Sequence, residues 1–365
     1  MEHKLTNSSL NFTEYNEKDA SGPWRITFDT NPDDCNMYCI MCEEHSEFST
    51  LKKERIISGR AHRRMDISII RETIKQMSSR GLKEIIPSTM GEPLLYNHFP
   101  EIMDLCREYN VKLNLTTNGT WPGIGAEKWA ELICPVTSDV KISWNGAKAS
   151  VQESIMKGSG YDRRIHDLKT FISVRDRIAK DGGNKCKITL QVTFMEANLS
   201  ELPDIVKLAL ENGVNRIKGH HLWAHFPEIE KQDLRRSSES IKRWNSIVDE
   251  CFQFVNDHSR NYGKSILLEN FTRIPDGTQR RMPDDWKCPF LGREAWVNYE
   301  GRFDPCCAPD AERKTLGYFG NVLENGGLPA IWESETYMKL KKGYMENEVC
   351  RKCNMRRPPG NLPEM

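Results

Sequence analysis

The sequence predicts an α/β protein, a partial barrel of six parallel β-α units followed by a small cysteine-rich domain. Between Pro23 and about His220, β-rich segments alternate with helical ones, which is typical of parallel β-α units. After about Asp233 one long helical pattern is followed by a loop-rich stretch that carries several of the 12 cysteines. Six strands are too few for the usual closed barrel of eight, so an open or partial barrel is expected.

The individual elements follow from hydrophobic periodicity. Strands are expected over 24–30, 83–89, 111–119, 138–146, 187–195 and 214–221. Helical spacing predicts helices over 66–81, 98–110, 201–213 and 241–260. The expected organisation is a polar segment 1–23, a core 24–233, a connecting helix and linker 234–283, a cysteine-rich domain 284–357 and a tail 358–365.

Composition narrows the possible partners and the compartment. The 52 basic and 52 acidic residues cancel, which argues against nucleic acid or an anionic membrane as the main partner. No uncharged apolar run reaches the length of a membrane-spanning helix, and the N-terminus lacks an apolar signal core. A cytoplasmic location is expected. Thiols stay reduced there, so clustered cysteines are expected to bind metal or to do redox work.

The first cysteine cluster lies in "DDCNMYCIMCEEH", residues 33–45, directly after the first expected strand. Parallel α/β folds build their active sites at this end of their strands. Two interpretations are open. Cys35, Cys39, Cys42 and His45 would form a tetrahedral zinc site. Alternatively, the three thiolates would hold a [4Fe–4S] cluster whose fourth iron is open to another ligand.

Three further segments lie after later strands. They are STMGEP (88–93), LTTNGT (115–120) and KISWNGA (141–147). Together with C-x3-C-x2-C after the first strand, this order resembles the radical S-adenosylmethionine (SAM) superfamily over roughly residues 24–225. Residues 145–169 resemble the helix that follows the fourth strand in that family. One departure is Met90, which stands where the family has the first glycine of a Gly-Gly-Glu-Pro segment.

The resemblance implies a SAM-binding [4Fe–4S] cluster held by Cys35, Cys39 and Cys42. An electron from this cluster would cleave SAM to a 5′-deoxyadenosyl radical. Glu92 would supply an anion for the SAM ammonium group, and Ser143 would contact its ribose or carboxylate. Gln191 and Thr193 share an inward-facing side of the fifth strand. The expected SAM contacts are Tyr38, Met41, Gly91, Glu92, Pro93, Asn118, Ser143, Gln191 and Thr193.

The second group of cysteines comprises Cys288, Cys306, Cys350 and Cys353. Four thiolates can close a zinc site, and C-x2-C pairs are common zinc ligands. The stretch from Cys288 to Cys306 also resembles the start of the SPASM or twitch auxiliary-cluster domains of radical SAM enzymes. The spacing is similar to that of the 2-deoxy-scyllo-inosamine dehydrogenases. This resemblance implies a second, auxiliary [4Fe–4S] cluster on the four thiolates, with Cys307 as a substitute ligand, a buried thiol or a hydrogen donor.

The segment RIKGHHLWAHFPEIEK, residues 216–231, is expected to line the substrate pocket, with His220 or His221 as a proton acceptor. The main hypothesis is hydrogen abstraction from a sugar- or cyclitol-like small molecule. The product would be a ketone, or an epimer if Cys307 or Cys251 returned a hydrogen atom. A flavodoxin or ferredoxin would supply electrons.

Two alternatives to this substrate class are open. The first is modification of a peptide. The short segment before the first strand leaves no room for a leader-peptide-binding domain, which favours a small molecule. The second alternative is a non-enzymatic zinc scaffold that binds protein.

Overall fold

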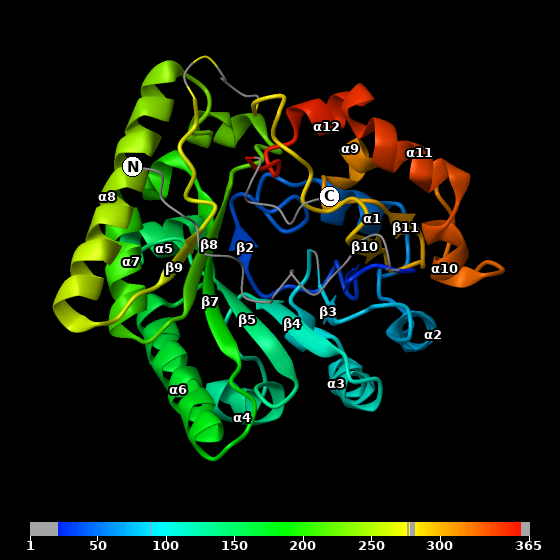
Figure 1. Cartoon of the computed structure of the whole chain (residues 1–365), viewed down its shortest axis with the longest axis horizontal. Helices are drawn as coiled ribbons and strands as arrows, with labels where there is room; N and C mark the ends of the chain where they lie inside the picture. Colours follow the sequence, from blue (N-terminus) through cyan, green and yellow to red (C-terminus); the bar gives the residue numbers. More distant parts are fainter. Residues whose placement is uncertain (1–20, 89, 276, 278–281, 359–365) are drawn as a thin grey trace.

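The computed structural model describes residues 21–88, 90–275, 277 and 282–358 (Figure 1). Within these residues the larger sheet has nine strands, and all neighbours are parallel except the pair β10 and β11. In spatial order the strands are β11 (Phe303–Asp304), β10 (Glu294–Val297), β1 (Arg25–Phe28), β3 (Glu84–Ile86), β4 (Lys112–Thr117), β5 (Thr137–Ser143), β7 (Lys187–Phe194), β8 (Arg216–His221) and β9 (Leu267–Glu269).

The six strands expected from the sequence are β1, β3, β4, β5, β7 and β8, and they are consecutive neighbours in the sheet. This confirms the partial barrel. Each strand alternates between two environments, as β5 illustrates. Its Val140 and Ile142 belong to the apolar core, whereas Asp139 and Lys141 are buried polar residues on the opposite face. The interior of the barrel is therefore polar, and the outer face of the sheet is covered by helices.

Figure 1 shows the helices ranged along the outer side of the curved sheet, with the C-terminal helices grouped beside its β10–β11 edge. The helices are α1 (Leu51–Ile57), α2 (Ile67–Ser78), α3 (Phe99–Glu108), α4 (Gly125–Ile133), α5 (Ala149–Ile155), α6 (Tyr161–Lys180), α7 (Leu202–Glu211), α8 (Ser238–Tyr262), α9 (Asp310–Lys314), α10 (Gly327–Trp332), α11 (Glu335–Gly343) and α12 (Glu348–Lys352). Short 3₁₀ turns are η2 (Pro93–Leu95), η3 (Glu196–Glu201), η4 (Pro227–Gln232) and η5 (Tyr344–Glu346).

The segment after β5 differs from the expectation. Residues 145–169 resembled a single helix, but the structure divides them into α5 and α6 with the strand β6 (Met156–Lys157) between them. Gly158, directly after β6, has a φ of 89°, a conformation that residues other than glycine rarely adopt and that turns the chain toward α6. The break allows β6 to pair with β2 (Tyr38–Cys39), so it connects this region to the first cysteine cluster.

The C-terminal segment joins the barrel rather than standing apart from it. Strand β10 pairs in parallel with β1, from Arg25 opposite Glu294 to Phe28 opposite Val297. Helix α10 packs against α2, and one apolar core includes residues from both parts of the chain. No helix in the described residues is both long and apolar enough to cross a membrane.

Candidate active site

The first cysteine cluster is held on a loop that begins where β1 ends. Cys35, Cys39 and Cys42 are all partly buried, and the amide of Cys42 donates to the carbonyl of Cys39 at 3.0 Å. Pairing of β2 with β6 positions the middle of the loop, and Met37 and Met156 form a small apolar cluster beneath the first two cysteines. The loop is therefore fixed by its own packing on both sides of the thiols.

His45 does not complete the set of ligands. Its Nε2 donates to the carbonyl oxygen of Pro32 at 2.8 Å, and the residue is buried. Within the described residues, no group of three or more His, Cys, Asp or Glu side chains is placed to hold a single metal ion. A structural zinc site needs four closed ligands, and the hydrogen bond of His45 to Pro32 leaves the first loop with three thiols. Three soft thiolates on one loop fit an iron–sulfur cluster instead.

The segment around Gly91 packs directly against this loop. A Cβ at Gly91 would overlap the backbone carbonyl of Asn31 and lie 2.9 Å from the carbonyl oxygen of Asp34. The amide of Glu92 donates to that same Asp34 oxygen at 2.7 Å, and Asn31 Nδ2 donates to the Glu92 carbonyl oxygen at 2.9 Å. Only glycine fits at this close approach of two backbones. Pro93 follows as the first residue of η2 and is buried.

Glu92 presents a buried carboxylate at the end of β4. Its oxygens accept hydrogen bonds from Thr117 Oγ1 at 2.8 Å, from the amide of Asn118 at 2.7 Å and from the amide of Leu94 at 3.2 Å. Burial raises its pKa to about 7, although these hydrogen bonds favour the charged form. A carboxylate in this environment is stabilised by a cation placed next to it, such as an ammonium group. Asn118 also reaches the cysteine loop, with Nδ2 3.8 Å from the Sγ of Cys35.

Arg164 was not predicted from the sequence. It lies in the first turns of α6, is 3% exposed, and donates to the backbone carbonyl oxygens of Asn118 and Ser143, which end β4 and β5. Its guanidinium also lies 5.0 Å from the centre of the Trp144 ring. No motif in the sequence distinguished this arginine from the neighbouring ones. Its position at the strand ends brings its guanidinium close enough to Cys39 and Glu92 to feel their charges.

Strands β7 and β8 confirm the inward side predicted for the fifth strand. Thr193 Oγ1 lies 3.3 Å from His220 Nε2, and Gln191 lines the same cavity as His220. Burial, together with the charge of Lys218, lowers the pKa of His220 to about 4, so the ring is neutral at pH 7. His221 has a different environment, because its ring packs edge-on against Phe194 and Trp244.

The remaining expected SAM contacts lie on the cysteine loop. Tyr38 is 52% exposed, and Met41 packs at the edge of the apolar cluster that contains Met37. The structure therefore brings both close to the three cysteines.

One cavity of about 390 Å³ connects the barrel interior with the second cysteine group. Gln191, Lys218 and His220 line it from the barrel, together with Met90 from the loop after β3. The cysteines that line it are Cys288, Cys306, Cys307, Cys350 and Cys353. The exposed surface of Cys307 is therefore part of this cavity. The sequence located both cysteine groups but did not predict that the second one opens into the barrel.

Comparisons with known proteins agree with this architecture. A family model of the radical SAM superfamily matches residues 32–174, and a model of the SPASM iron–sulfur cluster-binding domain matches residues 288–354. The chain is thus a member of the radical SAM superfamily. Within that superfamily it is an enzyme with a C-terminal SPASM domain, and its cofactors are SAM, a SAM-binding [4Fe–4S] cluster and an auxiliary iron–sulfur cluster.

Relatives match across both domains. Mycofactocin maturase MftC of Mycobacterium tuberculosis is 21% identical over 348 residues, covering 90% of this chain and 74% of the relative. PqqA peptide cyclase of Xanthomonas oryzae pv. oryzae is 24% identical over 329 residues, covering 88% and 78%. Streptococcus suis SuiB bound to its precursor peptide SuiA superposes with a TM-score of 0.60 at 14% identity, covering 93% and 72%.

These findings correct the expected substrate. The prediction of a sugar- or cyclitol-like substrate is wrong, because relatives that match both domains are a maturase and a peptide cyclase. The comparisons support a radical SAM enzyme. They do not support the oxidoreductase or epimerase type that was expected together with that substrate. The non-enzymatic zinc scaffold is likewise excluded by the family. The length of chain before β1 does not distinguish small-molecule from peptide substrates.

Proposed function

We propose that this protein is a radical SAM/SPASM enzyme that modifies a peptide. The observation that carries the proposal is the alignment of about nine-tenths of the chain, both domains included, with MftC and PqqA peptide cyclase. The cavity supports it, since barrel and C-terminal residues line one space into which a peptide side chain fits.

In this proposal Cys35, Cys39 and Cys42 hold the SAM-binding cluster, and the buried carboxylate of Glu92 binds the SAM ammonium group. When bound, SAM and this cluster would supply a 5′-deoxyadenosyl radical able to abstract a hydrogen atom from the substrate. Arg164 fixes the ends of β4 and β5, and with Ser143 and Asn118 it orients SAM. The other proposed SAM contacts are Tyr38, Met41, Gly91, Pro93, Gln191 and Thr193.

The other proposed roles lie deeper in the cavity. His220 is proposed as the proton acceptor, because its ring lines the cavity at the end of β8. His221 packs against aromatic rings and is better suited to supporting His220 than to proton transfer. The auxiliary cluster is assigned to Cys288, Cys306, Cys350 and Cys353, with Cys307 facing the same cavity. A flavodoxin or ferredoxin is proposed as the electron donor.

The test uses short peptides encoded beside this protein's gene. Each is synthesised with deuterated candidate residues and incubated anaerobically with the reconstituted enzyme, SAM and dithionite. A mass change in one peptide, with deuterium transferred into 5′-deoxyadenosine, is expected. Deuterium transfer from a polyol, with every peptide unchanged, would refute the proposal.

A further inference from the structure

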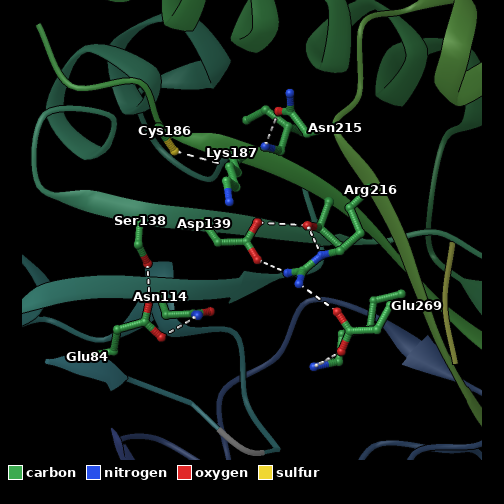
Figure 2. A network of polar contacts seen from close by, with 12 residues as sticks. Glu84, Asn114, Ser138, Asp139, Cys186, Lys187, Asn215, Arg216 and Glu269 are labelled. Atoms are coloured by element: carbon green, nitrogen blue, oxygen red, sulfur yellow. Dashed lines mark hydrogen bonds and ion pairs between the residues drawn. The ribbon is translucent and has the colours of Figure 1, made fainter. Parts of the chain in front are cut away.

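The bottom of the barrel is closed by buried ion pairs. Figure 2 shows Asp139 and Glu269 on either side of Arg216, and Glu84 accepting hydrogen bonds from Asn114 and Ser138. The Arg216–Glu269 distance is 2.6 Å. Since these groups satisfy one another, they form a floor below the cavity rather than a site that needs a ligand.

The ion-paired residues of this network carry no net charge. Arg25 pairs with both Glu84 and Glu294, while Lys218 pairs with Glu269 at 3.2 Å. The network contains four cations and four carboxylates, namely Arg25, Arg216, Lys218 and Arg357 with Glu84, Asp139, Glu269 and Glu294.

Lys141 lies one layer above this floor and adds a positive charge that the network does not balance. It is 6% exposed, lines the cavity and is on β5, with its side chain on the same side as those of Asp139 and Ser143. Among the described residues no side chain makes an ion pair or hydrogen bond with its ammonium group. Its ammonium group has no partner among these residues and faces a cavity, so it offers a place for an anion.

The charged neighbours of Lys141 strengthen this conclusion. Lys218, Arg25 and Arg216 act on it as like charges, and Asp139, a carboxylate that acts on it in the opposite sense, already binds Arg216. Burial first, and then these cations, lower the pKa of Lys141 to about 7. An anion bound next to Lys141 would stabilise the charged form of its ammonium group.

We propose that Lys141 is a substrate-binding residue that holds a carboxylate group of the peptide between the ion-paired floor and the SAM site. This inference rests on the proposed peptide substrate. The carboxylate comes from an acidic side chain or from the peptide's C-terminus, two sources with the same chemistry. Lys141 precedes Ser143 by two residues on β5, so it lies about 7 Å deeper along the strand than the proposed SAM contact. A carboxylate bound at Lys141 leaves the neighbouring carbons of the substrate facing SAM.

The experiment measures binding to the reconstituted holoenzyme with SAM present. Three N-acetylated pentapeptides serve as probes: acetyl-Ala-Ala-Glu-Ala-Ala-amide, its Gln counterpart as the amide, and the acetylated Gln counterpart with a free C-terminal carboxylate. At least one carboxylate peptide is expected to bind about tenfold tighter than the neutral one, equivalent to about 1.4 kcal/mol. Which of the two binds identifies the source of the carboxylate. Equal affinity for all three overturns the proposal.

Variants separate this role from a structural one. Lys141→Met should lose the preference for the carboxylate peptide, whereas Lys141→Arg should keep most of it. The matched control, Lys339→Met, removes an exposed lysine on α11 and should bind as the unmodified protein does. SAM affinity should be unchanged in all three variants. A Lys141→Met variant that weakens SAM binding as much as peptide binding would place the lysine in the SAM site and overturn the proposal.

A further measurement tests the carboxylate site independently of the proposed peptide substrate. Glutarate, a dicarboxylate without peptide bonds, is tested as a competitor. If glutarate binds as tightly as the acidic peptide and only in proteins that retain Lys141 or its arginine replacement, the carboxylate site is supported and the peptide assignment is weakened. If neither glutarate nor any carboxylate peptide binds in preference to the neutral peptide, the site itself is refuted, whatever the enzyme's substrate.

Discussion

Replacing Gly91 with alanine tests whether the contact between two backbones builds the SAM site. The added methyl group would overlap the Asn31 carbonyl and approach the Asp34 oxygen to 2.9 Å. Neither carbonyl can retreat freely, since Asn31 O accepts from the Asp34 amide at 3.0 Å and Asp34 O accepts from the Glu92 amide at 2.7 Å. Overpacking of this kind costs about 1–3 kcal/mol, and one displaced hydrogen bond adds about 1 kcal/mol.

A local penalty of about 3 kcal/mol at this loop corresponds to roughly a 100-fold loss of SAM affinity. The measurement is equilibrium dialysis of SAM against the anaerobically reconstituted enzyme, together with iron content and the rate of 5′-deoxyadenosine release. The control is Gly160→Ala, because Gly160 has an ordinary φ of −102° and no atom within 4 Å of an added Cβ. If Gly91→Ala binds SAM as tightly as Gly160→Ala, the close approach does not shape the site.

Three other changes test the proposed ligands. Replacing Cys35, Cys39 and Cys42 together by alanine should abolish SAM cleavage while leaving the iron of the auxiliary cluster; cleavage at the original rate would refute the assignment. Cys350→Ala should lower iron by about one cluster and leave some SAM cleavage, and unchanged iron would count against that ligand set. Glu92→Gln should weaken SAM binding about tenfold, because a charge-assisted hydrogen bond is lost. The pKa of Glu92 is raised to about 7, so its carboxylate becomes charged as pH rises. SAM affinity should therefore increase between pH 6 and pH 8 in the original protein, and a Glu92→Gln variant with the same increase would contradict this role.

The alternation of elements was readable from the sequence because each barrel strand buries an apolar outer side against helices. Val140 and Ile142 illustrate that side in β5. The strands β9, β10 and β11 were missed for a physical reason. They are two to four residues long, and their pairing depends on the edges that the barrel offers rather than on a local period.

Some residues of the candidate site could be predicted from the sequence, and others could not. Cys35, Gly91 and Glu92 were predictable because ligands and close backbone contacts need particular residue types at fixed positions after a strand. Arg164 and Lys141 were not, because their roles depend on which groups surround them. An arginine early in a helix and a lysine in a strand carry no signal until the structure shows their surroundings. The arginine bonds two strand ends, and the lysine has no partner among the described residues.

The position of the second cysteine group follows from strand pairing. An open barrel leaves β1 with an unpaired edge, and β10 covers that edge in parallel register. The ion pair from Arg25 to Glu294, at 2.8 Å, lies on directly opposed residues and so favours this register over a slipped one. Because Cys288 precedes β10 and Cys306 follows β11, the same register places both thiols beside the barrel interior. The second cysteine group therefore lines the barrel cavity as a consequence of how the sheet closes its edge.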